Sequence, residues 1–122
     1  MNNWMNNWMN NLENNIKKLD AIAELKSNWD LHGAPEFDKL LIEFCKENLY
    51  ELEDRLKVQP EIFPTNNETI QFEFKNGSDW LEIEIPNDMS HIDCFMFKNG
   101  KETEQECSLD ALLKVVEESF YG

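Results

Sequence analysis

The sequence predicts an α+β fold in the order ααββββα, with a four-stranded antiparallel sheet and helices packed on one of its faces. Three segments repeat apolar residues every three or four positions, which is the period of an amphipathic helix. Between residues 68 and 107 the apolar period falls to two, the period of a half-buried strand. With 122 residues, of which 41% are hydrophobic, the chain has room for one domain over residues 1–122 with a single core.

Residues 1–27 are expected to form an N-terminal amphipathic helix. Its apolar side chains, among them Ile16 and Leu19, fall on one stripe, while the paired asparagines take the opposite, solvated side. Asparagine is a poor helix former, costing about 0.5 kcal/mol per residue relative to alanine, so the first two turns are an extension that is helical only when docked. Trp4 and Trp8 of this extension are predicted partner contacts. The alternative translation starts are Met1, Met5 and Met9.

A turn and a second helix follow. In the stretch NWDLHGAP we expect Trp29 to fill the junction between helices and sheet and Asp30 to accept hydrogen bonds from turn amides. A loop that contacts a partner is the alternative interpretation. Pro35 suits the first turn of a helix over residues 36–57. The apolar stripe of that helix consists of Phe37, Leu40, Leu41, Phe44, Cys45, Leu49, Leu52 and Leu56.

The sheet is expected over residues 68–107. The stretch QPEIFPTNN carries two prolines and predicts an extended connection before the first strand. ETIQFEFK and LEIEI alternate apolar and polar residues, and NGSD between them predicts a hairpin turn. SHIDCFMFK is apolar on both faces, which predicts a central strand or one covered by a helix on its second side. KETEQEC predicts a polar edge strand, and Ser108 is expected to cap a final helix over residues 108–120.

Glutamates occupy alternating positions in three of the predicted strands, between apolar residues in ETIQFEFK and LEIEI and between polar ones in KETEQEC. Their side chains are therefore expected on the face away from the helices, as cross-strand neighbours. Like charges directly opposite one another destabilise a sheet, so they indicate either a solvated surface that resists aggregation or a surface kept for binding. Both interpretations remain open at this point. The predicted partner-binding carboxylates are Glu73, Glu82, Glu84, Glu102, Glu104 and Glu106.

The charge balance narrows the classes of partner. Lys and Arg number 11 and Asp and Glu number 25, which gives a net charge of −14. Such a charge repels nucleic-acid phosphates and anionic membrane surfaces, so neither is expected as a direct partner. A basic protein surface is attracted, and such surfaces are common on nucleases and nucleic-acid-binding complexes.

The start of the chain lacks the basic and apolar regions of a signal peptide, and no stretch approaches the roughly 18 apolar residues of a membrane span. We therefore expect a cytoplasmic protein whose cysteines are reduced. No Gly-rich phosphate loop is present, so no cofactor is expected. The two histidines, His32 and His91, have no second ligand at metal-binding spacing, so no metal is expected either. Cys45, His91 and Asp93 form a weak candidate for a nucleophile, a base and an orienting carboxylate.

Several motifs resemble those of a widespread, largely uncharacterised family of small bacterial and phage proteins. The family pattern runs L-x-x-N-W-D-G-Y-G-A-x-P, P-x-V-x-P-T, I-x-L-E-W and L-E-I-E-I. The likeness covers about residues 19–85 and departs at Leu31 and His32, where the family has Gly and Tyr. It supports the fold, and no activity follows from it. The matching residues are Leu25, Asn28, Trp29, Asp30, Gly33, Ala34, Pro35, Pro60, Ile62, Pro64, Thr65, Ile70, Gln71, Phe72, Glu73, Phe74, and Leu81 to Ile85.

These observations favour a non-enzymatic inhibitor of the antitoxin, immunity or phage anti-defence type. Its acidic sheet face would cover a basic, nucleic-acid-handling surface of a partner protein. The alternative is an assembly or regulatory subunit that docks through the N-terminal Trp/Met helix, with homodimerisation through that helix as one form. Deleting residues 1–11 and measuring the mass in solution separates these two. A small hydrolase using Cys45 and His91 is the weakest alternative.

Overall fold

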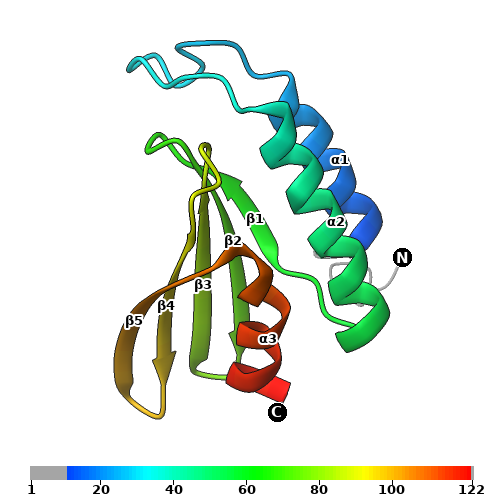
Figure 1. Ribbon diagram of the computed structural model, residues 1–122, viewed down its shortest axis with the longest axis vertical. Coiled ribbons are helices and arrows are strands. Elements are labelled where there is room, and N and C mark those ends of the chain that lie inside the picture. The colour runs from blue at the N-terminus through cyan, green and yellow to red at the C-terminus, as the bar shows by residue number, and fades with distance from the viewer. Residues whose placement is uncertain (1–10, 122) are drawn as a thin grey trace, which may run out of the picture.

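The computed structural model describes residues 11–121, so Trp4, Trp8 and the first two turns of the predicted N-terminal helix lie outside the described residues. The α+β class is confirmed, with three α-helices and a five-stranded antiparallel sheet in the order β1-β2-β3-β4-β5 (Figure 1). The elements are α1 (Leu12–Ala23), α2 (Lys39–Leu56), β1 (Glu61–Pro64), β2 (Thr69–Asn76), β3 (Asp79–Pro86), β4 (Ile92–Lys98), β5 (Lys101–Cys107), a 3-10 turn (Leu109–Ala111), α3 (Leu112–Val116) and a π-helical turn (Glu117–Tyr121).

The prediction of four strands was wrong, because the stretch between the prolines pairs with the sheet as β1. Ile62 lies opposite Phe72 of β2 and is buried. Proline cannot donate a backbone hydrogen bond, so it is confined to edge strands and strand ends. Pro60 directly precedes β1 and Pro64 is its last residue, and β1 is an edge strand that pairs only with β2. Both prolines therefore meet that rule.

Helix α1 ends at Ala23, four residues before the predicted end. The amides of Glu24 and Leu25 bond to carbonyls three residues back, which closes the last turn. Asn28 then adopts a positive φ of 66°, a backbone conformation outside the right-handed helix. At the other end, Asn11 caps the helix by accepting the amide of Asn14 at 2.8 Å.

Asn15 contradicts the expectation that the paired asparagines face solvent. It is fully buried on the inner side of α1, and its Nδ2 donates to the Pro60 carbonyl at 2.8 Å and to Gln59 Oε1 at 3.1 Å. Gln59 in turn donates to the Leu49 carbonyl of α2 at 2.8 Å. The asparagine therefore joins α1 to the segment that leads into β1, a pairing that the helical period alone does not reveal.

The interhelical loop is held as predicted around Asp30, whose carboxylate accepts the amides of His32 at 2.8 Å and Ala34 at 3.0 Å. These bonds hold the pKa of Asp30 below its usual value. Trp29 is half-buried against the core and packs on the Phe37 ring at a centroid distance of 6.0 Å. Its indole N–H donates to the Pro35 carbonyl at 3.0 Å, so the loop closes on itself.

Helix α2 is shorter than predicted at both ends. Asp38 is the N-cap and accepts the Leu40 amide at 2.9 Å, while Lys57 ends the helix in the left-handed conformation. The buried residues of α2 are Leu41, Ile42, Cys45, Leu49 and Leu52, and Ile42 was not part of the predicted stripe. Leu40 is 70% exposed, because it lies about 100° from Leu41 on the side of the helix axis away from Ile42 and the other buried residues.

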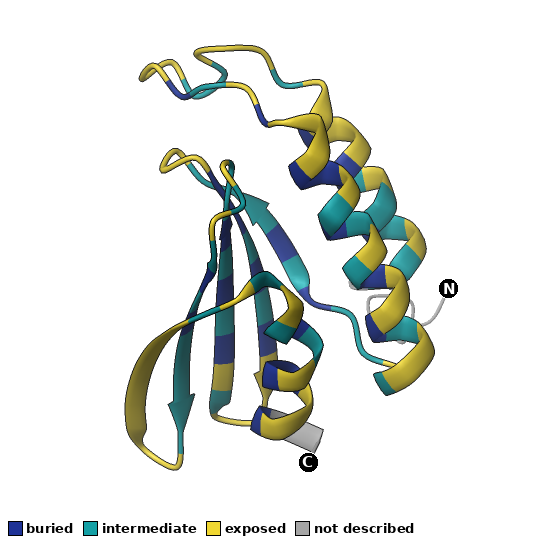
Figure 2. Cartoon of the chain, viewed as in Figure 1, coloured by how far each residue is buried: buried dark blue, intermediate teal, exposed yellow. Residues whose placement is uncertain are grey.

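One core lies between the helices and the inner face of the sheet. Figure 1 shows α1 and α2 side by side along the β1 edge and α3 in front of β2, with its axis roughly along the strands. Along β2 and β3 the buried residues alternate with less buried ones, whereas β5 is exposed along nearly its whole length (Figure 2). The largest fully buried side chains are Leu19, Leu41, Leu49, Leu52, Ile70, Phe72, Leu81, Ile83, Ile85, Ile92, Leu112 and Val116.

The C-terminal helix is less regular than predicted, since a 3-10 turn precedes α3 and a π-helical turn follows it. Ser108 stands at the N-cap position but caps nothing. Its hydroxyl donates instead to the Asp110 carboxylate.

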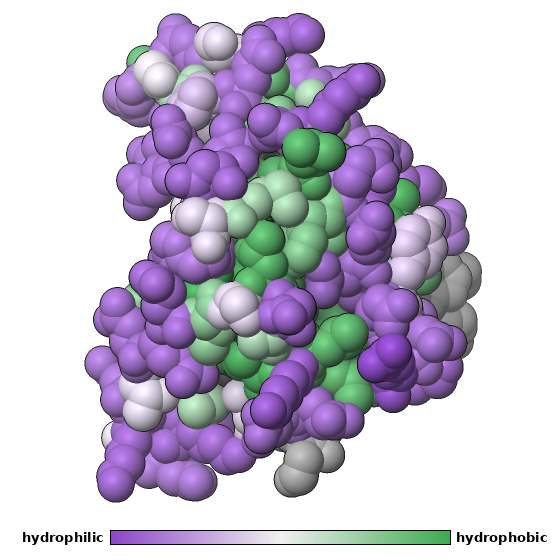
Figure 3. All heavy atoms as spheres, in the orientation of Figure 1, coloured by the Kyte–Doolittle hydropathy of each residue, from purple (hydrophilic) through white to green (hydrophobic). Residues whose placement is uncertain are grey.

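Beside this helix, Figure 3 shows apolar side chains gathered in the middle of the helix-bearing face. Phe44, Leu109 and Leu113 line a groove of about 480 Å³ between α2 and α3.

No helix between residues 11 and 121 is both long enough and apolar enough to pass through a membrane.

Candidate binding face

The strand side chains that point away from the helices form a surface that we call the outer face. Residues directly opposite across its strands run Glu61, Glu73, Glu82, Phe95 and Glu104 in one row. A second row runs Phe63, Gln71, Glu84, Asp93 and Glu106, and a third runs Lys75, Trp80, Phe97 and Glu102. The buried side chains of α1, α2 and α3 belong to the core on the opposite side, so none of these helices packs on the outer face.

The structure brings all six predicted carboxylates onto this face. It adds Glu61, which the sequence interpretation missed because β1 was read as a connection, and Asp93, which was considered only for catalysis. The alternation of Asp93 with Ile92 and Cys94 was the signal that could have placed it there. The outer-face carboxylates are Glu61, Glu73, Glu82, Glu84, Asp93, Glu102, Glu104 and Glu106.

Four pairs of these carboxylates lie directly opposite each other across the strands. They are Glu61–Glu73, Glu73–Glu82, Glu84–Asp93 and Asp93–Glu106. Partial burial, and then the charge of Glu73, raise the pKa of Glu82. Partial burial, then Asp93 and Glu82, raise the pKa of Glu84. Opposed like charges destabilise a sheet by roughly 0.2–1 kcal/mol per pair. The only outer-face lysine among the paired strand residues, Lys75, is bound to Glu73 at 3.2 Å.

The double substitution Glu82→Gln and Glu84→Gln is expected to stabilise the fold at pH 7 by about 0.5–1 kcal/mol. A carboxyl whose pKa is raised on folding holds more protons in the native state, so stability falls as pH rises from its unfolded pKa, near 4.3, through the raised folded pKa. The variant has no carboxyl at these two positions, so it lacks the part of the fall in stability that they cause. Urea unfolding at intervals from pH 4 to 7 measures the difference from wild type, which should widen with pH.

Glu43→Gln with Glu47→Gln, on the exposed side of α2, is the control and should retain the wild-type fall. If the outer-face variant followed the same pH dependence as this control, the carboxylates would not be coupled as described.

Aromatic side chains interrupt the acidic surface. Trp80 stacks on Phe97 of the adjacent strand at a ring-centroid distance of 4.7 Å and an interplanar angle of 21°. Phe95 stands between Glu82 and Glu104 in its row. The sequence predicted that β4 is either a central strand or covered by a helix on its second side. Strand β4 lies inside the sheet, between β3 and β5. None of α1 to α3 covers its second apolar side. Trp80 is 37% exposed, so this aromatic surface is reachable from outside.

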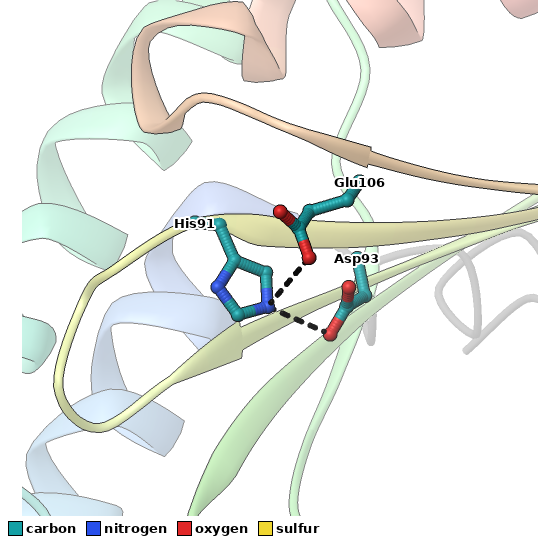
Figure 4. A group of neighbouring side chains, drawn as sticks. All are labelled: His91, Asp93 and Glu106. Carbon is teal, nitrogen blue, oxygen red and sulfur yellow. Dashed lines mark hydrogen bonds and ion pairs between the residues drawn. The ribbon is translucent and has the colours of Figure 1, made fainter.

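His91, Asp93 and Glu106 come together at the other end of the same face, from the start of β4 and from β5 (Figure 4). His91 Nε2 lies 3.2 Å from Asp93 Oδ2 and 3.8 Å from Glu106 Oε1, and its Nδ1 is 2.8 Å from Ser90 Oγ. The three candidate ligand atoms lie within 4.8 Å of one another, close enough to share one divalent cation. A protonated imidazole between two carboxylates satisfies the same groups without any ion. Sequence spacing did not reveal Glu106, because it belongs to the neighbouring strand.

The structure does not bring Cys45 to these residues. Cys45 is fully buried in the core on α2, and burial raises the pKa of its thiol well above the usual value. His91 and Asp93 contact Glu106 on the outer face, so the sheet separates them from the thiol. A nucleophile needs a thiolate within hydrogen-bond reach of its base, and this arrangement supplies neither.

Comparisons of the chain with protein-family models, with curated proteins and with solved structures gave no match. The likeness to the bacterial and phage family therefore stays a prediction.

Proposed function

We propose that this protein is a non-enzymatic inhibitor that binds a basic protein partner through its outer face, in the manner of an antitoxin, immunity or anti-defence protein. The observation that carries the proposal is the gathering of eight carboxylates from five strands on one face that no described helix covers. Four directly opposed like-charge pairs lower the stability of the free sheet. A cationic partner relieves this repulsion when it binds.

The geometry suits a surface that normally handles nucleic acid. Neighbouring strands lie about 4.8 Å apart, so their carboxylates form a closely spaced array of negative charge. A nucleic acid presents a comparably dense array of phosphates to the same kind of basic surface. Net charge of −14 also accelerates the encounter with a basic protein and makes the association rate dependent on salt. Occupying such a surface is sufficient to inhibit its owner, so no catalytic group is needed.

The test compares the wild-type protein with the outer-face variant Glu73→Gln, Glu82→Gln and Glu84→Gln. Both are immobilised and exposed to the proteins of the encoding organism at low salt. We expect the wild type to retain a basic protein that elevated salt releases, and the variant to bind it at least about tenfold more weakly. If the retained protein binds duplex DNA, the wild type should displace that DNA.

The matched control is Glu43→Gln, Glu47→Gln and Asp54→Asn, which removes the same charge from exposed positions of α2. This control should bind the partner like the wild type. Equal loss in both variants would assign the attraction to net charge alone. Unchanged binding by the outer-face variant would remove the outer face from the proposal.

A further inference from the structure

A pocket of about 380 Å³ opens on the outer face over β3, β4 and β5. Its aromatic part is the Trp80–Phe97 stack together with Phe95. Its carboxylates are Glu82, Glu102 and Glu104, so both strands that flank β4 contribute acidic groups. Four other pockets in the described part of the chain lack this combination of stacked rings and three carboxylates.

We propose that this pocket receives an arginine side chain of the basic partner, an inference that rests on the proposed function. The pocket would then determine which arginine of the partner's basic surface binds at this position. The surrounding carboxylates supply a less selective attraction.

The register explains why a cation is favoured there. Phe97 lies opposite Trp80 on one side and Glu102 on the other, and Phe95 lies between Glu82 and Glu104. The face of an aromatic ring carries negative electrostatic potential and attracts a cation placed over it. Carboxylates on both sides of the rings add charge-assisted hydrogen bonds to the same ligand. An anionic or neutral polar ligand would meet repulsion or gain much less from these groups.

The shape of the groups favours guanidinium over ammonium. Guanidinium is planar and weakly hydrated, stacks on aromatic rings and presents paired N–H donors that match a carboxylate. Ammonium is a compact, strongly hydrated charge that gains less from a flat aromatic wall. The chain's own nearby cation, Lys75, lies opposite Trp80 on β2, but its ammonium group is bound to Glu73 at 3.2 Å. Among residues 11–121 no lysine or arginine lines the pocket, so a cationic side chain of a partner can enter it.

The test uses the full-length protein and the blocked tripeptide acetyl-Gly-Arg-Gly-amide, followed through the indole N–H resonance of Trp80. That resonance is identified by its loss in Trp80→Leu. We expect a saturable shift with a dissociation constant in the millimolar range. The tripeptide with citrulline, which has nearly the same shape and no charge, should bind about fivefold or more weakly. The lysine tripeptide should also bind more weakly than the arginine one.

Two variants and one control locate the site. Phe97→Leu and Glu102→Gln should each weaken arginine-tripeptide binding by about threefold or more. Phe63→Leu replaces an outer-face aromatic of β1 that lies outside the pocket and should leave binding unchanged. The backbone amide spectrum of each variant reports whether it is folded, and Glu102→Gln changes an exposed side chain that the core does not need.

A second probe, a ten-residue oligolysine, separates this inference from the proposed function. If the oligolysine binds the outer face but the arginine tripeptide does not shift Trp80, the pocket assignment is wrong and the acidic binding face stands. Equal affinity for the arginine, lysine and citrulline tripeptides would also overturn the arginine assignment. If neither probe binds, both proposals are contradicted.

Discussion

Replacing Phe72 with alanine is expected to lower the free energy of unfolding by about 3–5 kcal/mol. Phe72 is fully buried at the centre of the inner face, where β2 is paired on both sides by Ile62 and Ile83. Removing the ring loses its transfer free energy and leaves a cavity that the close-packed core fills only in part. Natural domains are stable by only about 5–15 kcal/mol, so the variant should approach the unfolding threshold. Urea unfolding followed by circular dichroism measures the change.

Phe95→Ala is the matched control, because it makes the same substitution in the same sheet on the outer face. Phe95 is half-buried and lies outside the core, so we expect a loss of about 1 kcal/mol. The contrast tests the one-sided arrangement of the helices. Equal losses for the two substitutions would mean that a comparable core covers the outer face.

Asn15→Asp is expected to destabilise the protein by about 3 kcal/mol or more at neutral pH. The substitution keeps the shape of the side chain and replaces its Nδ2 donor by an oxygen. The Pro60 carbonyl and Gln59 Oε1 would then face a carboxylate instead of an N–H group. Asn15 is fully buried, and its Oδ1 has no hydrogen-bond partner in the described part of the chain, so the new charge gains no compensating bond.

The pH dependence gives this prediction a second readout. Burial raises the pKa of an introduced carboxyl, so its destabilising effect should be greatest at neutral pH and shrink as the pH falls toward 4. Asn66→Asp makes the same change at an exposed position in the turn between β1 and β2 and should cost less than about 0.5 kcal/mol. A cost at Asn15 no larger than at Asn66 would contradict the hydrogen bonds that join α1 to the start of β1.

The apolar period was sufficient to locate β2 and β3, because alternation follows directly from the geometry of a strand with one buried face. The short apolar run between turn signals located β4. The apolar period failed at β1, where the four residues Glu61–Pro64 form a strand only because Ile62 pairs with Phe72 of the neighbouring strand. It failed again at Asn15, since a buried asparagine depends on acceptors 44 and 45 residues away along the chain. Signals of this kind are absent from any local window of sequence.

The candidate binding face also has one part that the sequence predicted and another that it did not. The sequence placed Glu73, Glu82 and Glu84 on a common outer face, because residues two apart in a strand share a face. It did not place Phe95 between Glu82 and Glu104, or Glu106 beside His91. These neighbours belong to different strands, and their contact depends on which residues lie opposite each other across the sheet.

By itself, the sequence determined the α+β class, the net charge of −14 and the alternation that places carboxylates on one side of the sheet. Composition and local period are sufficient for these properties, since each depends on residue type and on neighbours along the chain. Only the tertiary structure decided that β1 joins the sheet and that Trp80 and Phe97 stack between carboxylates on either side. Strand register and long-range packing bring these groups together, and the free energy that selects them comes from burial of the whole core.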